Sequence, residues 1–333
     1  MRETPPSPSL NLDALLPREI AKRAEAVGAR KCQLAFWPLL TLAVLAGAFI
    51  ALGAIFSTTV SAGTNGNLPF GVARLLAGLV FCLGLILVIV GGAELFTGNT
   101  LISMAWASGT VSTRDMVRNW ALVYVGNFLG ALGTAVLVYC SAQYTFGGGL
   151  VGLTILDIAR AKTTLHFGQA VSLGILCNAL VCLAVWLSLG ARTTADKILA
   201  IVFPISAFVA AGFEHSIANM YFIPIGLLVK SDATFLATIG KSAADYVSLT
   251  WTNFLFVNLL PVTIGNIIGG VGLVGLVYWF IYLRPDVSPS IQTTASPYSP
   301  SHPIPLPLKE SAADARVAVG EGSIGDKREG DPL

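Results

Sequence analysis

The sequence predicts an all-α membrane protein with six transmembrane helices, arranged as two inverted three-helix repeats in which the second and fifth helices are broken. Two features of composition point to this class. Only 11% of the 333 residues are Asp, Glu, Lys or Arg, whereas about 25% is usual in soluble domains. The mean hydropathy of +0.74 and the 34 glycines are typical of helices that pack closely in a bilayer. A third feature, an internal duplication, gives the arrangement.

Net charge and cysteine content exclude two further classes. The formal net charge is +2, so the chain has no basic excess for nucleic acid, and we expect no nucleic-acid partner. The five cysteines lack the paired spacing of a metal or redox site. We therefore expect buried thiols, no metal and no cofactor.

Residues 1–33 are expected to form a cytoplasmic N-terminal segment. They contain prolines and mixed charges but no apolar core segment, so we expect no cleaved signal peptide. Residues 16–31 predict an amphipathic helix, because Ile20, Ala24 and Val27 fall on one stripe and the charged residues lie elsewhere. We expect this helix to lie on the cytoplasmic surface of the membrane.

Residues 34–283 are expected to form a six-span transporter domain. Apolar runs of about 20 residues, the length that crosses a bilayer, occupy residues 37–56, 70–92, 120–140, 167–189, 198–228 and 251–282. Polar residues interrupt the second run, which continues at residues 101–107, and interrupt the fifth run between residues 212 and 219. Both interruptions fall at membrane depth.

The distribution of basic residues predicts the orientation. Lys and Arg are enriched in the N-terminal segment, in the second and fourth connections and directly after the last run. By the positive-inside rule both termini are cytoplasmic, in a multi-pass protein of the cytoplasmic (inner) membrane. Residues 284–333 lack a periodic apolar pattern and predict a disordered, Pro-rich cytoplasmic tail.

The two halves repeat each other at their unusual positions. Glu94 is followed five residues later by Asn99 in the second run, and Glu214 by Asn219 in the fifth. Residues 126–133 and 265–272 share a pattern of one Asn and three Gly. Three spans per half is an odd number, so the second copy is inverted, and such repeats place the substrate path between the breaks near the midplane.

The two glutamates and the two asparagines at the breaks are expected to be structural. Glu94 and Glu214 are the acidic residues of the predicted spans, and a charge there costs about 2.5–3.5 kcal/mol or more. We expect each carboxylate to be buried against backbone N–H groups freed by the break, or to be protonated. His215 is the one His in the predicted spans, and Leu95 occupies its position in the first copy. We therefore favour a functional His215 over a structural one.

These motifs resemble the formate/nitrite transporter family of pentameric anion channels with aquaporin-shaped protomers. The resemblance runs from about residue 16 to residue 283. It rests on AELFTGNT at residues 93–100, AKTT at 161–164 and AAGFEHSIANMYFIPIG at 210–226. Aquaporins instead carry two Asn-Pro-Ala loops, and this tripeptide does not occur in the sequence.

The resemblance implies a transport path and a mechanism. It implies Thr97 opposite His215 at the pore centre and Phe81 with Phe208 at a periplasmic constriction. It implies Leu85 with Leu95 in the second-span pore wall, nearer the middle and the cytoplasmic side. Lys162 would lie near the outer vestibule, and Asn178 would approach His215. A monovalent anion would be attracted by the positive vestibule and would pass as its neutral acid, with His215 as proton donor. The residues alone leave other interpretations open, with Lys162 as an interfacial lysine and the phenylalanines as packing.

We expect channel-like transport of formate, with nitrite as the nearest alternative and hydrosulfide, lactate or acetate behind it. The expected partners are the anion, protons, the lipid bilayer and further copies in a homopentamer. Burial and nearby carboxylates act on the protonation of His215 in opposite directions, so its resting state stays open. An intramembrane enzyme is not expected, because the spans contain no pair of aspartates, no Gly-x-Ser-x-Gly and a single His. A structural, partner-binding role through the tail would leave the duplicated breaks unexplained.

Overall fold

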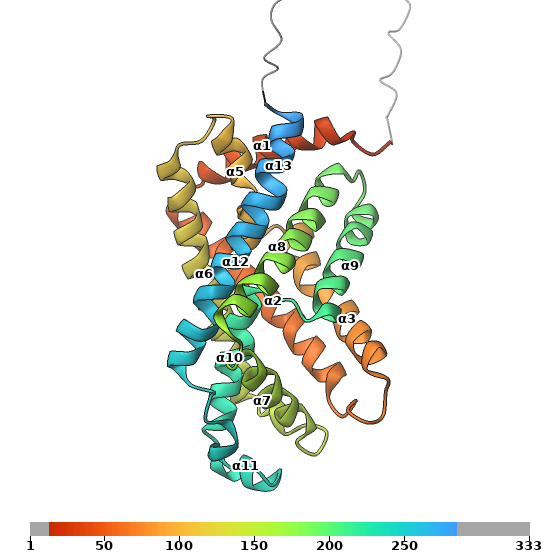
Figure 1. Cartoon of the computed structure of the whole chain (residues 1–333), viewed down its shortest axis with the longest axis vertical. Coiled ribbons are helices and arrows are strands. Elements are labelled where there is room, and N and C mark those ends of the chain that lie inside the picture. The colour runs from red at the N-terminus through yellow and green to blue at the C-terminus, as the bar shows by residue number, and fades with distance from the viewer. Residues whose placement is uncertain (1–12, 285–333) are drawn as a thin grey trace, which may run out of the picture. The chain divides into compact units, whose positions relative to one another are not determined.

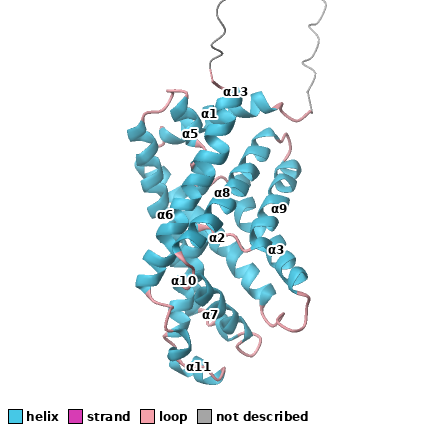
Figure 2. Ribbon diagram, viewed as in Figure 1, coloured by secondary structure: helices cyan, strands magenta, loops and turns pink. Residues whose placement is uncertain are grey.

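The computed structural model describes residues 13–284, and every regular element in this range is a helix (Figure 2). Six of these helices are long and apolar enough to cross a membrane, which confirms the predicted number. They are α2 (Phe36–Ser61), α3 (Phe70–Gly91), α6 (Thr113–Cys140), α8 (Phe167–Gly190), α9 (Thr194–Ala211) and the continuous segment Asn253–Tyr282. The predicted disordered tail lies outside the described residues apart from Arg284.

Shorter helices complete this part of the chain. They are α1 (Pro17–Cys32), α4 (Phe96–Asn99), α5 (Ile102–Ala107), η1 (Gln143–Thr145), α7 (Leu150–Lys162), α10 (Ser216–Lys230), α11 (Ala233–Thr238) and η2 (Ala243–Tyr246). The last span consists of η3 (Asn253–Leu259), α12 (Leu260–Ile267), η4 (Ile268–Gly275) and α13 (Leu276–Tyr282), of which η3 and η4 are π-helical. The apolar-run search missed α7, because its 13 residues are too few to cross a bilayer.

Helix α1 is present where the amphipathic pattern predicts it, but its apolar face does not turn towards lipid. Ile20, Ala21 and Ala24 are buried against a cluster that includes Met104 of α5 and Trp186 of α8. Helices α1, α5 and α13 gather at one end of the bundle, whereas α7 and α11 lie at the other (Figure 1). The N-terminal helix therefore closes one end of the bundle.

Both predicted breaks are present, and a glycine in the left-handed region makes each of them. Helix α3 ends before Gly92 at φ +81°, and α9 ends before Gly212 at φ +77°. A residue with Cβ is strained in this conformation, and glycine is the usual residue at a helix end of this kind. After the break, α4 and α5 lead to the α1 end and α10 leads to the α7 end (Figure 1), so the two halves run in opposite directions.

One asparagine from the third span of each half holds the chain at its break. Asn127 accepts a hydrogen bond from the N–H of Phe96 at 2.9 Å and donates to the carbonyl of Glu94 at 2.9 Å. Asn266 accepts from the N–H of Ser216 at 2.9 Å and donates to the carbonyl of Glu214 at 3.0 Å. These are the asparagines of the repeated Asn/Gly pattern. Each satisfies backbone groups that the break frees at membrane depth.

The glycines of that pattern divide into two groups. A Cβ on Gly130 of α6 would overlap the carbonyl oxygen of Val44 in α2, and a Cβ on Gly269 would overlap the carbonyl oxygen of Ile175 in α8. The positions of a Cβ on Gly133 and on Gly272 have no atom within 4 Å. A Cβ on the first glycine, Gly126 or Gly265, would also overlap its neighbour. Close helix approach therefore requires the first two glycines of each pattern and not the last.

Replacing Gly130 with Ala is expected to lower the free energy of unfolding by about 1–3 kcal/mol, because α2 and α6 must move apart to accept the methyl group. Gly133→Ala is the matched control on the same helix and should leave stability nearly unchanged. The measurement is the thermal unfolding midpoint of each purified variant in detergent. Equal midpoints for the two variants would contradict the close approach of α2 and α6.

Candidate transport pathway

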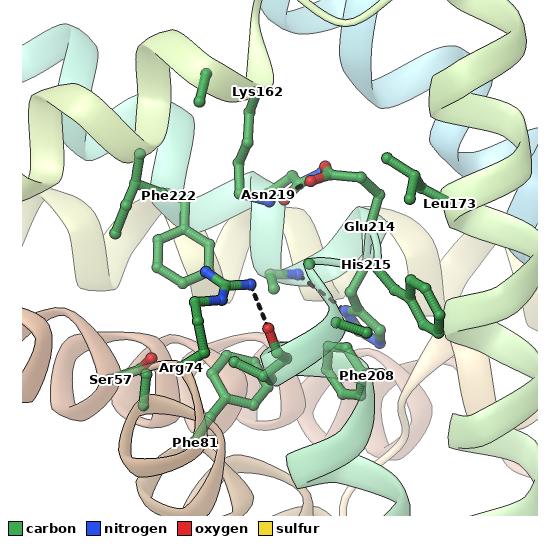
Figure 3. A pocket seen from close by; sticks show the side chains of 18 of the residues that line it. Ser57, Arg74, Phe81, Lys162, Leu173, Phe208, Glu214, His215, Asn219 and Phe222 are labelled. Carbon is green, nitrogen blue, oxygen red and sulfur yellow. Dashed lines mark hydrogen bonds and ion pairs between the residues drawn. The ribbon is translucent and has the colours of Figure 1, made fainter. Parts of the chain in front are cut away.

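Two cavities and a small space between them line up through the centre of the helical bundle. The α7-side cavity has a volume of about 440 Å³, and its lining includes Arg74, Phe81, Lys162, Phe208, Glu214, His215, Asn219 and Phe222 (Figure 3). The α1-side cavity has a volume of about 300 Å³, and its lining includes Val27, Lys31, Leu85, Glu94, Leu95 and Asn99. The central void between them has a volume of about 10 Å³, which is the room for about one water molecule.

Two pairs of apolar side chains separate these spaces. Phe81 and Phe208 pack edge to face with ring centroids 5.6 Å apart, and both line the α7-side cavity and the central void. Leu85 and Leu95 line both the central void and the α1-side cavity. All four are at most 4% exposed. The path is therefore closed by an apolar layer on either side of the void, the kind of constriction that opposes ion passage.

His215 lies at the central void, where it also caps the helix that follows the break. Its Nδ1 accepts a hydrogen bond from the backbone N–H of Ala218 at 3.1 Å. Its Nε2 lies 2.9 Å from Oγ1 of Thr97. Because Nδ1 is an acceptor, these partners assign the ring proton to Nε2, which donates to the threonine hydroxyl. The imidazole in this arrangement is neutral.

Thr97 and Asn178 lie behind His215 rather than along the cavities. Both are fully buried, and neither is among the residues that line the two cavities or the void. Asn178, which the resemblance places near His215, donates instead to the carbonyls of Thr97 at 3.3 Å and Asn266 at 2.6 Å. It also donates to Oγ1 of Thr100 at 3.2 Å. Its contribution to His215 is therefore indirect, through the position of Thr97.

The two glutamates at the breaks form ion pairs with lysines. Oε1 of Glu94 lies 2.8 Å from Nζ of Lys31, and Oε1 of Glu214 lies 2.7 Å from Nζ of Lys162. We expected freed backbone N–H groups or a proton to compensate these carboxylates, and the structure shows lysines in that place. A paired, hydrogen-bonded charge can be buried at much lower cost than an isolated one.

Asparagines complete the same network in both halves. Asn99 donates to Oε2 of Glu94 at 2.8 Å, and Asn219 donates to Oε2 of Glu214 at 2.7 Å. A second asparagine in each half accepts a hydrogen bond from the first one. Asn119 accepts from Asn99 and donates to the backbone carbonyl of Lys31 at 3.1 Å. Asn258 accepts from Asn219 and donates to the backbone carbonyl of Lys162 at 3.0 Å.

Sequence reasoning did not assign a role to Lys31, although the sequence carries a signal for it. Lys31 lies five residues before Phe36, the start of α2, and Lys162 lies five residues before Phe167, the start of α8. The duplication therefore extends back to the helices α1 and α7, and each repeat contains four elements rather than three. Lys31 is the next-to-last residue of α1 and Lys162 is the last residue of α7, so the two lysines lie at matching helix ends.

The two networks differ in two contacts. Nδ2 of Asn258 also donates to Oε2 of Glu214 at 3.2 Å, and Asn119 makes no matching bond to Glu94. Nζ of Lys31 also donates to Oδ1 of Asn99 at 2.9 Å. Nζ of Lys162 instead lies 5.4 Å from the ring centroid of Phe222, and the buried Oδ1 of Asn219 makes no hydrogen bond. The second half thus leaves one acceptor unsatisfied beside the cavity.

The net charge of the side chains that line each cavity differs between the two cavities. Lys31 and Glu94 line the α1-side cavity and offset each other. Lys162, Glu214 and Arg74 line the α7-side cavity, so one positive charge is in excess there. Within residues 13–284, no group of three or more His, Cys, Asp or Glu side chains is placed to hold a metal ion. The geometry is that of a narrow path with an electropositive vestibule.

Comparisons with known proteins agree with this geometry. The family model described as "Formate/nitrite transporter" matches residues 18–280. The formate channel FocA of Escherichia coli (strain K12) is 46% identical over 274 residues, which cover 82% of this chain and 96% of that protein. The formate channel FocB of the same strain is 38% identical over 279 residues, which cover 83% of this chain and 98% of that protein.

Solved structures agree as well. A structure described as "Pentameric formate channel with formate bound" is 43% identical, with a TM-score of 0.71, and the match covers 75% of this chain and 98% of that one. An "FNT family ion channel" is 32% identical, with a TM-score of 0.65, and the match covers 79% of this chain and 98% of that one. The chain is a multi-pass membrane protein that belongs to the formate/nitrite transporter family.

Proposed function

We propose that this protein is a homopentameric channel that carries formate across the cytoplasmic membrane. The observation that carries the proposal is the row of two cavities joined through an apolar constriction at His215. The names of the relatives and the formate-bound pentamer among the similar structures support the substrate and the assembly. Both ends of the described chain lie at the α1 end (Figure 1), where the basic residues of α1 favour the cytoplasm.

The constriction favours a neutral form of the substrate. A naked anion that passes the phenylalanine and leucine layers loses its hydration without gaining a partner from these four side chains, because all of them are apolar. The conjugate acid carries no net charge and avoids most of this cost. We infer that formate crosses the constriction as formic acid, after it takes a proton in a cavity.

The hydrogen bonds of His215 limit how it can take part. A neutral imidazole with its proton on Nε2 does not readily give that proton away, so the ring must first be protonated at Nδ1 before it can act as an acid. Protonation at Nδ1 breaks the bond from the N–H of Ala218 and places a cation at the N-terminus of α10, where the helix dipole opposes it. Proton uptake at His215 is therefore coupled to loosening of the first turn of α10, which supports pH-dependent transport.

Nitrite is the second candidate, because the family model includes it. It is also a small monovalent anion with a neutral conjugate acid, and the contacts around the void do not select between the two. Uptake of labelled formate and nitrite into liposomes that hold the purified protein separates the candidates. We expect faster formate uptake at equal concentration and pH, with empty liposomes as the control. Nitrite uptake that exceeds formate uptake at every concentration would make nitrite the substrate.

His215→Asn is expected to fold normally but to lose the pH dependence of formate uptake. Asn can accept from the N–H of Ala218 as a helix cap and donate to Thr97, but it does not titrate near neutral pH. The measurement is uptake per folded pentamer between pH 5 and pH 8. His166→Asn is the matched control, because His166 also precedes a helix but is exposed and outside the path. Identical pH profiles of wild type and His215→Asn would remove His215 from the mechanism.

Breaking the ion pair of the second half is expected to destabilise the protein more than removing it. Lys162→Met leaves the carboxylate of Glu214 buried without its cation, which typically costs about 3–5 kcal/mol. The double variant Lys162→Met/Glu214→Gln removes both charges and should recover most of this loss, because Gln can still pair with Asn219. Thermal unfolding midpoints of the single and double variants test this. A double variant no more stable than the single one would show that the pair is not the structural unit.

A further inference from the structure

We propose that Arg74 is the group that attracts anions into the α7-side cavity, and that Lys162 is a scaffold residue whose charge is offset by Glu214. This inference rests on the proposed transport function and deepens it. It assigns the electrostatic step to a residue of α3 that the sequence patterns did not single out.

The guanidinium of Arg74 reaches from the first turns of α3 to the edge of the helix break (Figure 3). Its Nε donates to the carbonyl of Ala210 at 3.1 Å, and its Nη2 donates to the carbonyl of Val209. Both carbonyls belong to the last turn of α9. Within residues 13–284 the remaining nitrogen, Nη1, makes no hydrogen bond. Arg74 is therefore held in place by two bonds and keeps a free donor at the cavity.

The other charges and dipoles around the cavity largely cancel. Lys162 and Glu214 lie 2.7 Å apart and offset each other. The C-terminus of α9 carries roughly half a negative charge and the N-terminus of α10, a few residues later, roughly half a positive one. Arg74 makes no ion pair with any residue between 13 and 284. The excess positive charge of the α7-side cavity therefore belongs to Arg74.

The internal duplication argues against a purely structural role for this arginine. Glu214 lies 214 − 94 = 120 residues after Glu94, and the same offset pairs Gly212 with Gly92 and Thr194 with Arg74. The break of the first half therefore forms without an arginine at the matching position. The scaffold therefore does not require a cation at this position, and an arginine occupies it only beside the α7-side cavity.

The consequence is a local rise in anion concentration at the mouth of the path. One uncompensated charge in a partly enclosed cavity attracts small anions and raises their rate of access, and salt in the same compartment screens it. The α1-side cavity has no such excess, because Lys31 and Glu94 offset each other. Added salt should therefore slow formate uptake when it is on the α7 side of the membrane and not when it is on the α1 side.

The test compares wild type with Arg74→Gln and Arg74→Lys in right-side-out and inside-out vesicles. Uptake of formate well below saturation is measured while an impermeant salt, potassium gluconate, is raised from about 20 to about 300 mM on one side, with sucrose as osmotic balance. Arg160→Gln is the matched control, because Arg160 is an exposed α7 cation that does not line the cavity. Thermal unfolding and native mass of each variant report folding and assembly.

At low salt, we expect formate uptake by Arg74→Gln to be roughly three- to tenfold slower than uptake by wild type. Uptake by this variant should no longer depend on the salt concentration at the α7 face. Arg74→Lys and Arg160→Gln should keep both the rate and the dependence. Equal salt dependence in wild type and Arg74→Gln overturns the proposal, as does a folded Arg74→Lys that has lost the dependence. If Arg74→Gln does not fold, the double variant Lys162→Met/Glu214→Gln decides, because it removes the ion pair and leaves Arg74 in place. Salt dependence that persists at the α7 face in this variant supports the proposal, and its loss overturns it. Wild-type protein that transports no formate at all would instead contradict the proposed function.

Discussion

A broken helix inside a bilayer exposes backbone groups and charges where there is no water to receive them, and the rest of this structure follows from how that exposure is compensated. Each break is enclosed by side chains from the neighbouring helices. Asn127 and Asn266 satisfy the freed backbone, and Lys31 and Lys162 balance the two buried carboxylates. These partners come from helices α1, α6, α7 and α12. The breaks can persist only while those helices are in place.

The asparagines and lysines that compensate the two breaks are the same in both halves, whereas the residues that face the path differ between the halves. His215 corresponds to Leu95, Arg74 corresponds to Thr194, and Oδ1 of Asn219 lacks the lysine contact that Asn99 has. Duplication thus accounts for a frame in which the two broken helices meet at the centre of the bundle. The differences between the copies give this frame a titratable centre, a positive vestibule on one side and a neutral one on the other.

The contacts of His215 show which parts of the structure its protonation can affect. Because His215 is a helix cap as well as a neighbour of the void, its protonation state and the geometry of α10 are linked. The same ring packs against Phe208 with centroids 5.9 Å apart. His215 therefore contacts both the helix that leads out of the break and one of the two rings that close the path. These contacts support the proposed coupling between protonation of the ring and opening of the constriction.

The sequence by itself determined the class, the six spans, both breaks and the duplication, because length, hydropathy and glycine placement act locally along the chain. It also singled out His215 by its place at the second break, and the resemblance to the family added Thr97, Phe81 and Phe208. The tertiary structure decided the partners: the lysines on Glu94 and Glu214, the position of Asn178 behind Thr97, and the burial of α1. It also brought Arg74 to the end of α9, 136 residues away in the chain. Such pairings depend on which helices pack together, and local sequence pattern does not encode the distance between residues of different helices.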